Sequence, residues 1–118
     1  MTFLEAIARE EGFYVAGSRP NRNNNPGDLE FHSWMTPFGG VLEECSNPRF
    51  AAFPTSDAGF SAMKHLFGFP IYKGNTVAQA LNTWAPPIEN QTNSYIANVC
   101  QWVGCQPTDI IDGLLEAV

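Results

Sequence analysis

The sequence predicts a single α+β domain that is mainly α, with a small β-ribbon beside a helical lobe. Apolar residues recur at helical spacing at the start of the chain and again through its second half. Between them, residues 17–54 are rich in Asn, Gly, Pro and Arg, which suits loops and short strands. No linker or repeat interrupts the 118 residues, which suffice for one core. We therefore expect one domain over residues 1–118, with a groove between ribbon and helices.

The first expected helix begins at a capping box, because Thr2 is followed three positions later by Glu5. The helix runs to about Glu11 and stops at Gly12. Short apolar pieces that suit the strands of a ribbon come next. These pieces are residues 29–31, 41–42 and 50–53.

Four further helices are expected after the ribbon, each with a polar cap and an apolar face at helical spacing. Their expected caps are Ser56 with Asp57, then Thr76 with Gln79 as a second capping box, then Thr92, and finally Thr108. The first three are expected to end near Gly68, at Pro86 and at Gly104, and the last carries Leu114 and Leu115 on its apolar face.

The net charge of −6 limits the expected partners. No basic stripe is available to neutralise phosphates, so we expect no nucleic acid. No apolar run is long enough to span a bilayer, so we expect no association with a membrane. We expect the protein to be a monomer. The N-terminus shows no signal-peptide pattern, as in a phage-encoded protein, a protein exported by another route, or a mature domain without its leader.

Three cysteines cannot all pair within one chain. Cys100 and Cys105 are close enough in sequence to bridge across a helix end, but buried or idle thiols are the favoured alternative. Cys45 stands alone. The two histidines, His32 and His65, show no zinc-type spacing with these cysteines, so we expect no metal site and no cofactor.

The first helix ends in two carboxylates, Glu10 and Glu11. At about 100° per residue, Glu11 falls between Leu4 and Ile7 in the middle of the apolar stripe, whereas Glu10 lies at its outer margin. Apolar surroundings raise the pKa of a carboxyl group, which a general acid requires near neutral pH. Glu11 is therefore the candidate acid. The alternative is a helix-end Glu that reaches water or accepts hydrogen bonds from a loop.

A second reacting carboxylate would have to come from another part of the chain. Glycosidase carboxyl pairs lie roughly 5–10 Å apart across the scissile bond, which adjacent residues cannot achieve. Asp28 and Glu30, in the loop that leads into the ribbon, are the nearest candidates. Their alternation along an extended segment would put both on one face. Glu43, Glu44 and Asp57 are more typical of exposed turns or caps.

Residues 21–29 form the most unusual segment, Asn-Arg-Asn-Asn-Asn-Pro-Gly-Asp-Leu. The amides of Asn24 and Asn25, beside Gly27, could bind sugar hydroxyl and acetamido groups, since an amide both donates and accepts hydrogen bonds. Turn formation is the alternative, because Asn-Pro-Gly is a strong turn former.

A later polar cluster, residues 84–95, supplies further candidates for substrate binding. Trp84 and Tyr95 could stack on sugar faces, although an aromatic residue at helical spacing more often belongs to a core. A core position is favoured for Trp84 and stays open for Tyr95. The Asn90 amide is the last candidate for substrate binding in this cluster.

Three ordered blocks of the chain resemble a family of small lysozyme-like proteins of phages and bacterial genomes. The first is Glu-Gly at 11–12 with Arg-Asn-Asn-Asn-Pro-Gly-Asp-Leu at 22–29. The second is Arg-Phe-Ala-Ala-Phe-Pro-Thr at 49–55 with Ala-Gly-Phe at 58–60. The third is Trp-Ala-Pro-Pro at 84–87 with Glu89, Asn90, Thr92, Tyr95 and Ile96. The similarity covers about residues 4–103.

The resemblance implies a lysozyme-like fold and cleavage of the β-1,4 bond between N-acetylmuramic acid and N-acetylglucosamine in peptidoglycan glycan strands. It implies that Glu11, the Glu before Gly, is the general acid. It further implies that Asn25, Gly27 and Asp28 border the cleft, and that Tyr95 projects toward the same site.

Where this family commonly has Asn, the chain has Asp28, which leaves the reaction outcome open. A muramidase would use a second carboxylate, and Asp28 and Glu30 favour it slightly. A lytic transglycosylase needs only the one Glu and gives anhydro-muramyl products. A non-catalytic virion or cell-wall-binding protein and a chitin hydrolase are further alternatives.

Overall fold

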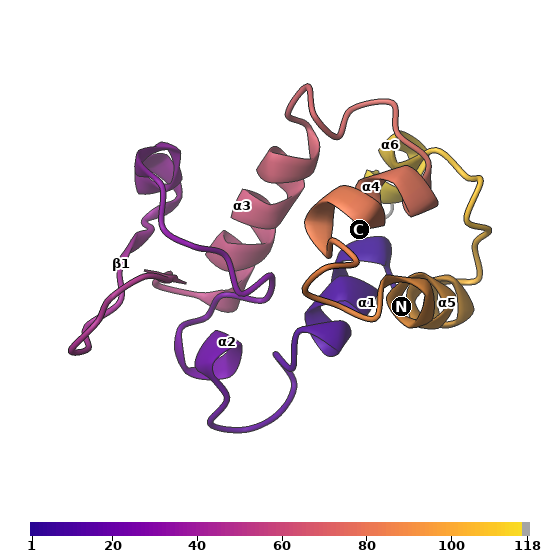
Figure 1. Cartoon of the computed structure of the whole chain (residues 1–118). Helices are drawn as coiled ribbons and strands as arrows, with labels where there is room; N and C mark the ends of the chain where they lie inside the picture. Colours follow the sequence, from indigo (N-terminus) through magenta and orange to yellow (C-terminus); the bar gives the residue numbers. More distant parts are fainter. Residues whose placement is uncertain (117–118) are drawn as a thin grey trace.

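The computed structural model describes residues 1–116, which are mostly helical with one two-stranded antiparallel sheet (Figure 1). The elements, in chain order, are α1 (Phe3–Glu10), α2 (Arg19–Arg22), the 3₁₀ helix η1 (Ser33–Phe38), β1 (Val41–Leu42), β2 (Ala51–Ala52), α3 (Ser56–Phe67), α4 (Val77–Trp84), α5 (Thr92–Val103) and α6 (Ile111–Leu115). The predicted class, α+β and mainly α, is confirmed.

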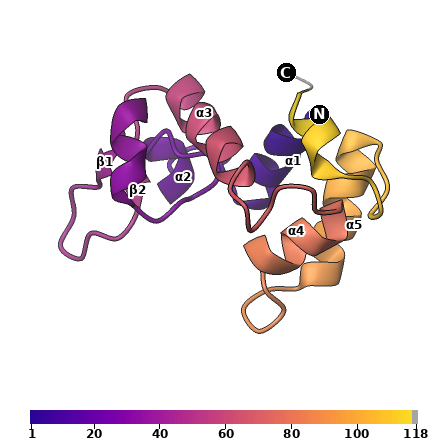
Figure 2. The ribbon, with the colours of Figure 1, turned by 90° about the horizontal axis from the view of Figure 1, so that it is seen from above.

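Helix α3 lies between two groups of elements (Figures 1 and 2). On one side are α2, η1 and the strands, and on the other are α1, α4, α5 and α6. Helix α1 packs against α5, α3 and α6, while α3 also packs against η1. Helix α3 therefore connects the two groups through its packing.

The hydrophobic core is continuous across these helices. Phe3 and Ile7 of α1 meet Met63 and Phe67 of α3 within one buried cluster. The rings of Phe3 and Phe67 pack edge to face with their centroids 5.4 Å apart, a favoured aromatic geometry. Because α1 is anchored in this core, the residue after its last turn is held in a defined position.

Both predicted capping boxes are confirmed. The Thr2 hydroxyl accepts from the Glu5 N–H at 3.1 Å, and the Glu5 carboxylate accepts from the Thr2 N–H at 2.9 Å. Thr76 and Gln79 form the same reciprocal pair at the start of α4. The predicted end of α1 is also confirmed, since its C-cap is residue 11 and Gly12 follows with φ of 84°, a conformation that glycine tolerates best.

Two predicted caps are wrong, because another residue occupies the N-cap position. Helix α3 is capped by Thr55, one residue before Ser56, and the Thr55 hydroxyl accepts from the Ala58 N–H at 3.1 Å. Thr92 is the first residue of α5 and not its cap. Its hydroxyl donates to the Ala85 carbonyl, which connects the start of α5 to the end of α4.

The predicted cap of the last helix, Thr108, is also wrong. Helix α6 begins only at Ile111, because Ile110 pairs with Thr76 in an isolated β-bridge. This bridge keeps the chain extended past residue 108, so a helix cannot begin there.

The predicted ribbon is present but shorter than expected. Its two strands pair antiparallel, with Val41 opposite Ala52 and Leu42 opposite Ala51. Residues 29–31 contribute only a bridge between Glu30 and Phe50. The helical turns α2 and η1 were not expected. Pro20 near the start of α2 favours helix there, since its ring fixes φ near the helical value.

The cysteines of the described chain are free thiols, with Cys45 exposed and both Cys100 and Cys105 buried. The favoured alternative of buried thiols therefore applies to the pair. Burial raises the pKa of the Cys105 thiol to about 12. Among residues 1–116, no helix combines the length and the apolar character needed to cross a bilayer.

Candidate active site

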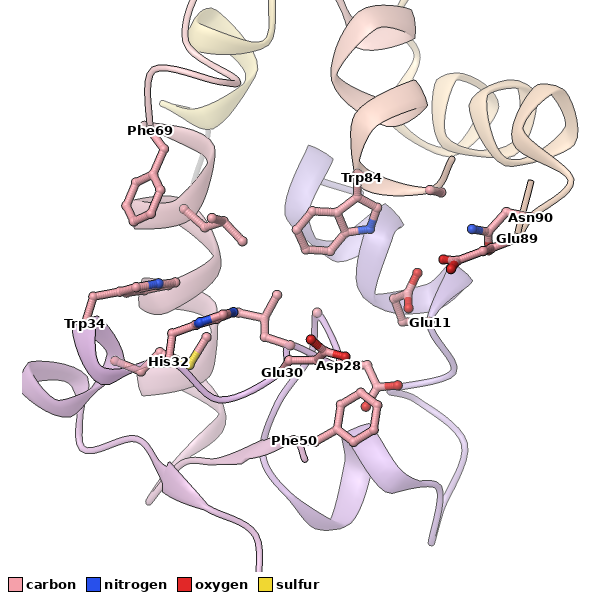
Figure 3. Close-up of a pocket in the computed structure, with 15 residues that line it drawn as sticks. Glu11, Asp28, Glu30, His32, Trp34, Phe50, Phe69, Trp84, Glu89 and Asn90 are labelled. Atoms are coloured by element: carbon pink, nitrogen blue, oxygen red, sulfur yellow. The ribbon is translucent and has the colours of Figure 1, made fainter. Parts of the chain in front are cut away.

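A cleft of about 630 Å³ contains the predicted acid (Figure 3). Its walls come from the end of α1, the loop after α2, η1, the end of α3 and the segment that follows α4. The predicted residues that line it are Glu11, Gly27, Asp28, Glu30 and Asn90. The fold therefore brings together five sequence-predicted site residues from three separate parts of the chain.

Glu11 lies in this cleft at the C-cap of α1, partly buried as the helical wheel predicted. Burial raises the pKa of its carboxyl group, and the nearby negative charges of Asp28 and Glu10 raise it further. The hydrogen bond from Tyr95 acts in the opposite direction. Since burial is the largest cause, the Glu11 side chain keeps its proton to higher pH than an exposed Glu does.

Two aromatic side chains orient the Glu11 carboxyl group. The Tyr95 hydroxyl donates to Glu11 Oε2 at 2.7 Å, and the indole N–H of Trp84 donates to that same hydroxyl at 3.1 Å. Because indole can only donate, the tyrosine must accept from Trp84 and give its own proton to Glu11. Oε2 is thereby occupied as an acceptor, so the acidic proton of Glu11 belongs on Oε1.

Both aromatic residues are packed against other parts of the protein. Tyr95 is only 6% exposed, and burial together with the Glu11 charge raises the pKa of its phenol, which keeps it a donor. The Trp84 ring stacks on Phe67 at 4.8 Å between centroids and also lines the cleft. Trp84 is therefore both a core contact, as favoured, and a cleft residue. For Tyr95, core and cleft positions were both left open. The structure shows that Tyr95 is buried and that its hydroxyl contacts Glu11.

Asp28 is held rigidly in the cleft wall. Arg19 Nε donates to Asp28 Oδ1 at 2.9 Å, and Arg19 Nη2 donates to Oδ2 at 2.6 Å. The same guanidinium lies over the Phe50 ring, 3.5 Å from its centroid, an arrangement that favours a cation. The Asp28 side chain is 11% exposed. This carboxylate is therefore a fixed negative charge, close enough to Glu11 to affect its pKa.

Glu30 is held less firmly than Asp28. It forms an ion pair with Arg49, but the Glu30 side chain is 45% exposed and that of Arg49 is 69% exposed. Exposed pairs of this kind contribute little to stability. Of the two predicted second carboxylates, Asp28 is therefore the one in a defined position.

The Asn-rich segment mainly builds the loop. Asn25 is fully buried, and its amide donates to the carbonyls of Leu29 and Ala51, each at 2.9 Å, and accepts from the Leu29 N–H at 3.0 Å. Asn24 donates to the Phe53 carbonyl at 3.2 Å. These bonds commit the Asn25 amide to the backbone, while the Asn24 oxygen accepts from the Ser56 hydroxyl at 3.5 Å, and neither residue, predicted to bind substrate, lines the cleft. The alternative of turn formation fits both residues.

We expect Asn25→Ala to destabilise the fold by about 3 kcal/mol, since three buried hydrogen bonds contribute about 1 kcal/mol each. Urea unfolding at neutral pH measures the loss. The control is Asn47→Ala, at an exposed loop position, which should change the unfolding free energy by less than about 0.5 kcal/mol. A loss for Asn25→Ala no larger than the control's would contradict a loop-building role.

Several cleft residues were missed by sequence reasoning. Figure 3 shows His32, Trp34 and Phe69 together at the end of the cleft away from Glu11. The Trp34 and Phe69 rings are 5.2 Å apart. The Glu89 carboxylate also lines the cleft, on the Glu11 side in this view. The aromatic set comes from an unexpected 3₁₀ helix and a turn after α3, where no periodicity marks a cleft position.

Glu10 points elsewhere than its neighbour. Its Oε1 accepts from the Asn98 amide at 2.6 Å, and it lines a smaller hollow instead of the main cleft. Glu10 and Glu11, which the helical wheel put at different positions relative to the apolar stripe, thus have different surroundings in the structure.

Neither the models of known protein families nor the curated proteins give a match to this chain.

Proposed function

We propose that the protein is a peptidoglycan-cleaving glycosidase with a lysozyme-like fold. It acts on the β-1,4 bond between N-acetylmuramic acid and N-acetylglucosamine, with Glu11 as general acid. One observation carries the proposal: a carboxyl group with a raised pKa faces an open cleft and is oriented by a buried tyrosine. The ordered blocks that resemble lysozyme-like proteins supply the substrate class.

In this proposal, Glu11 protonates the glycosidic oxygen as the bond to the sugar breaks. The hydrogen bond from Tyr95 occupies Oε2, so the proton is delivered from Oε1. Loss of the leaving group creates positive charge on the sugar ring. The fixed carboxylate of Asp28, in the same cleft, stabilises that charge by Coulomb attraction.

Sugar binding in the cleft would depend on stacking and hydrogen bonds. The aromatic end offers Trp34 and Phe69 as apolar surfaces for sugar rings, while Glu89 and Asn90 offer polar groups near the acid. With a net charge of −6, the protein gains nothing from electrostatic attraction to an anionic wall.

A muramidase is the first candidate, because Asp28 supplies a second carboxylate beside Glu11. A lytic transglycosylase is the second candidate, and the ion pair with Arg19 favours it. Both Asp28 oxygens already accept from the guanidinium, which reduces their capacity to activate water. In that case Glu11 alone acts as acid and then as base toward the sugar's own hydroxyl.

The test is digestion of purified peptidoglycan, with chitin in parallel. Solubilisation with one new reducing end per bond indicates a muramidase, whereas release of anhydro-muramyl ends without new reducing ends indicates a transglycosylase. Preferential cleavage of chitin would mean that chitin, and not peptidoglycan, is the substrate. No solubilisation of either polymer would contradict an enzymatic function and leave a wall-binding protein.

The pH–rate profile tests the role of Tyr95. Cleavage should be best at mildly acidic pH and fall as pH rises through the raised pKa of Glu11, because only the protonated acid reacts. Tyr95→Phe removes a donor that stabilises the ionised form, so the pKa of Glu11 should rise further. We expect the alkaline limb to move to higher pH while the maximal rate falls roughly tenfold, the effect of one hydrogen bond to a charged group.

The control is Tyr14→Phe, at an exposed tyrosine, which should leave the profile unchanged. An alkaline limb that stays in place in Tyr95→Phe, or moves to lower pH, would contradict the role given to Tyr95. All profiles are recorded at fixed ionic strength.

A further inference from the structure

A second hollow adjoins the cleft beside the candidate acid. It has a volume of about 270 Å³, and Glu11 and Asn90 line both the hollow and the cleft. At about 30 Å³ per water molecule, the hollow has room for about nine waters, or for a short length of peptide. A group attached to a sugar bound at Glu11 could therefore enter it directly.

The wall of this hollow is a polar stripe along α5. Gln91, Ser94 and Asn98 recur at intervals of three and four residues, which puts them on one side of the helix. The Asn98 amide nitrogen donates to Glu10 Oε1 at 2.6 Å. Gln91 and Ser94 are exposed to solvent. The stripe thus presents donors and acceptors to an incoming ligand.

The chemistry of the lining favours a peptide over another sugar. Besides the carboxyl groups of Glu10 and Glu11, the lining offers side-chain amides and a hydroxyl. These groups match the alternating N–H and C=O groups of a peptide backbone. The one aromatic residue in the lining, Tyr95, has its ring buried. Among the described residues, the hollow therefore offers no open aromatic face for a sugar ring, whereas the cleft offers several.

We propose that this hollow binds the peptide stem that muramic acid carries on its lactyl group. The inference rests on the proposed function. It names the preferred substrate as glycan strands that still bear their stems, with Gln91 and Ser94 as residues that determine this preference. The glycan would occupy the cleft while the first residues of the stem lie along α5.

The experiment compares two substrates, intact glycan strands and the same strands stripped of their stems by an amidase. Wild-type protein should cleave the intact strands about tenfold faster, as expected from one or two net hydrogen bonds. Ser94→Phe fills the hollow and should lower the rate on intact strands to that on stripped strands, with the stripped rate unchanged. Gln91→Ala, which adds no bulk, should remove part of the preference.

The matched control is Gln101→Phe, one turn beyond Asn98 on the same stripe, exposed and outside the hollow. It should keep the full preference. Equal wild-type rates on the two substrates would overturn the inference while leaving the proposed function intact. Equal losses on both substrates in Ser94→Phe and Gln91→Ala would also overturn it, since the hollow would then bind glycan. Cleavage of neither substrate would overturn the proposed function and this inference with it.

Discussion

Glu11→Gln is expected to reduce peptidoglycan cleavage by about 10³-fold, within the range typical of a lost general acid. The amide has the same shape but cannot deliver a proton. The Tyr95 hydroxyl that donates to Glu11 Oε2 can donate equally well to the amide oxygen. The loss should therefore appear in kcat, with little change in KM. Release of soluble muropeptides at the optimal pH measures it.

The same variant should be more stable than the wild type at neutral pH. Burial raises the pKa of Glu11 in the folded protein, so its ionisation costs the folded state more than the unfolded chain. Below the unfolded pKa of about 4.3, both states are protonated and the two proteins should differ little. As pH rises through the folded pKa, the wild type should lose stability relative to Glu11→Gln. Urea unfolding at pH 4 and pH 8 separates this effect from misfolding.

Two controls accompany Glu11→Gln. Glu44→Gln, at an exposed position, should leave activity unchanged. Glu10→Gln should lose at most a few-fold, because Glu10 does not line the cleft. If Glu10→Gln instead lost activity by orders of magnitude while Glu11→Gln stayed active, the acid would be assigned to the wrong residue.

Asp28→Asn is expected to reduce cleavage by about 100-fold, whereas Glu30→Gln should lose only a few-fold. The difference follows from their positions. Asp28 is clamped by Arg19 and largely buried, while Glu30 is 45% exposed. Loss of the fixed negative charge should remove its attraction for the developing sugar cation, an electrostatic contribution of the kind that often dominates catalysis.

A second readout separates this electrostatic role from loop damage. The Asp28 charge raises the pKa of Glu11, so Asp28→Asn should lower that pKa and move the alkaline limb of the pH–rate profile to lower pH. This is opposite to the shift expected for Tyr95→Phe. A loss of less than a few-fold in both Asp28→Asn and Glu30→Gln would mean that Glu11 acts alone, as in a transglycosylase.

The sequence was most informative where local rules decide the structure. Thr2 with Glu5 marked the start of α1, and the wheel position of Glu11 indicated which carboxylate would be partly buried at its end. These features depend on residues within a few positions of one another, so tertiary packing did not override them. The sequence predicted Asp28 near Glu11 because the loop that contains Asp28 leads directly into the ribbon.

The remaining features depend on contacts between distant parts of the chain. The Asn25 amide hydrogen-bonds the backbone of a strand 26 residues away, so sequence alone could not distinguish a loop-building Asn from a sugar-binding one. The bond from Tyr95 to Glu11 joins residues 84 positions apart. Arg19 was missed because its pairing with Asp28 joins residues nine positions apart in the chain. No local pattern indicates these pairings.

Mass spectrometry of the products from purified peptidoglycan tests the central claim most directly, with wild-type protein and Glu11→Gln compared at equal concentration. We expect the wild type to release muropeptides cut at the β-1,4 bond between N-acetylmuramic acid and N-acetylglucosamine, and Glu11→Gln to release almost none. The mass of the new muramyl end, a reducing end that contains the added water or an anhydro end that lacks it, then identifies the reaction. Uncut glycan strands with the wild type, or the same muropeptides in equal yield from Glu11→Gln, would contradict the claim.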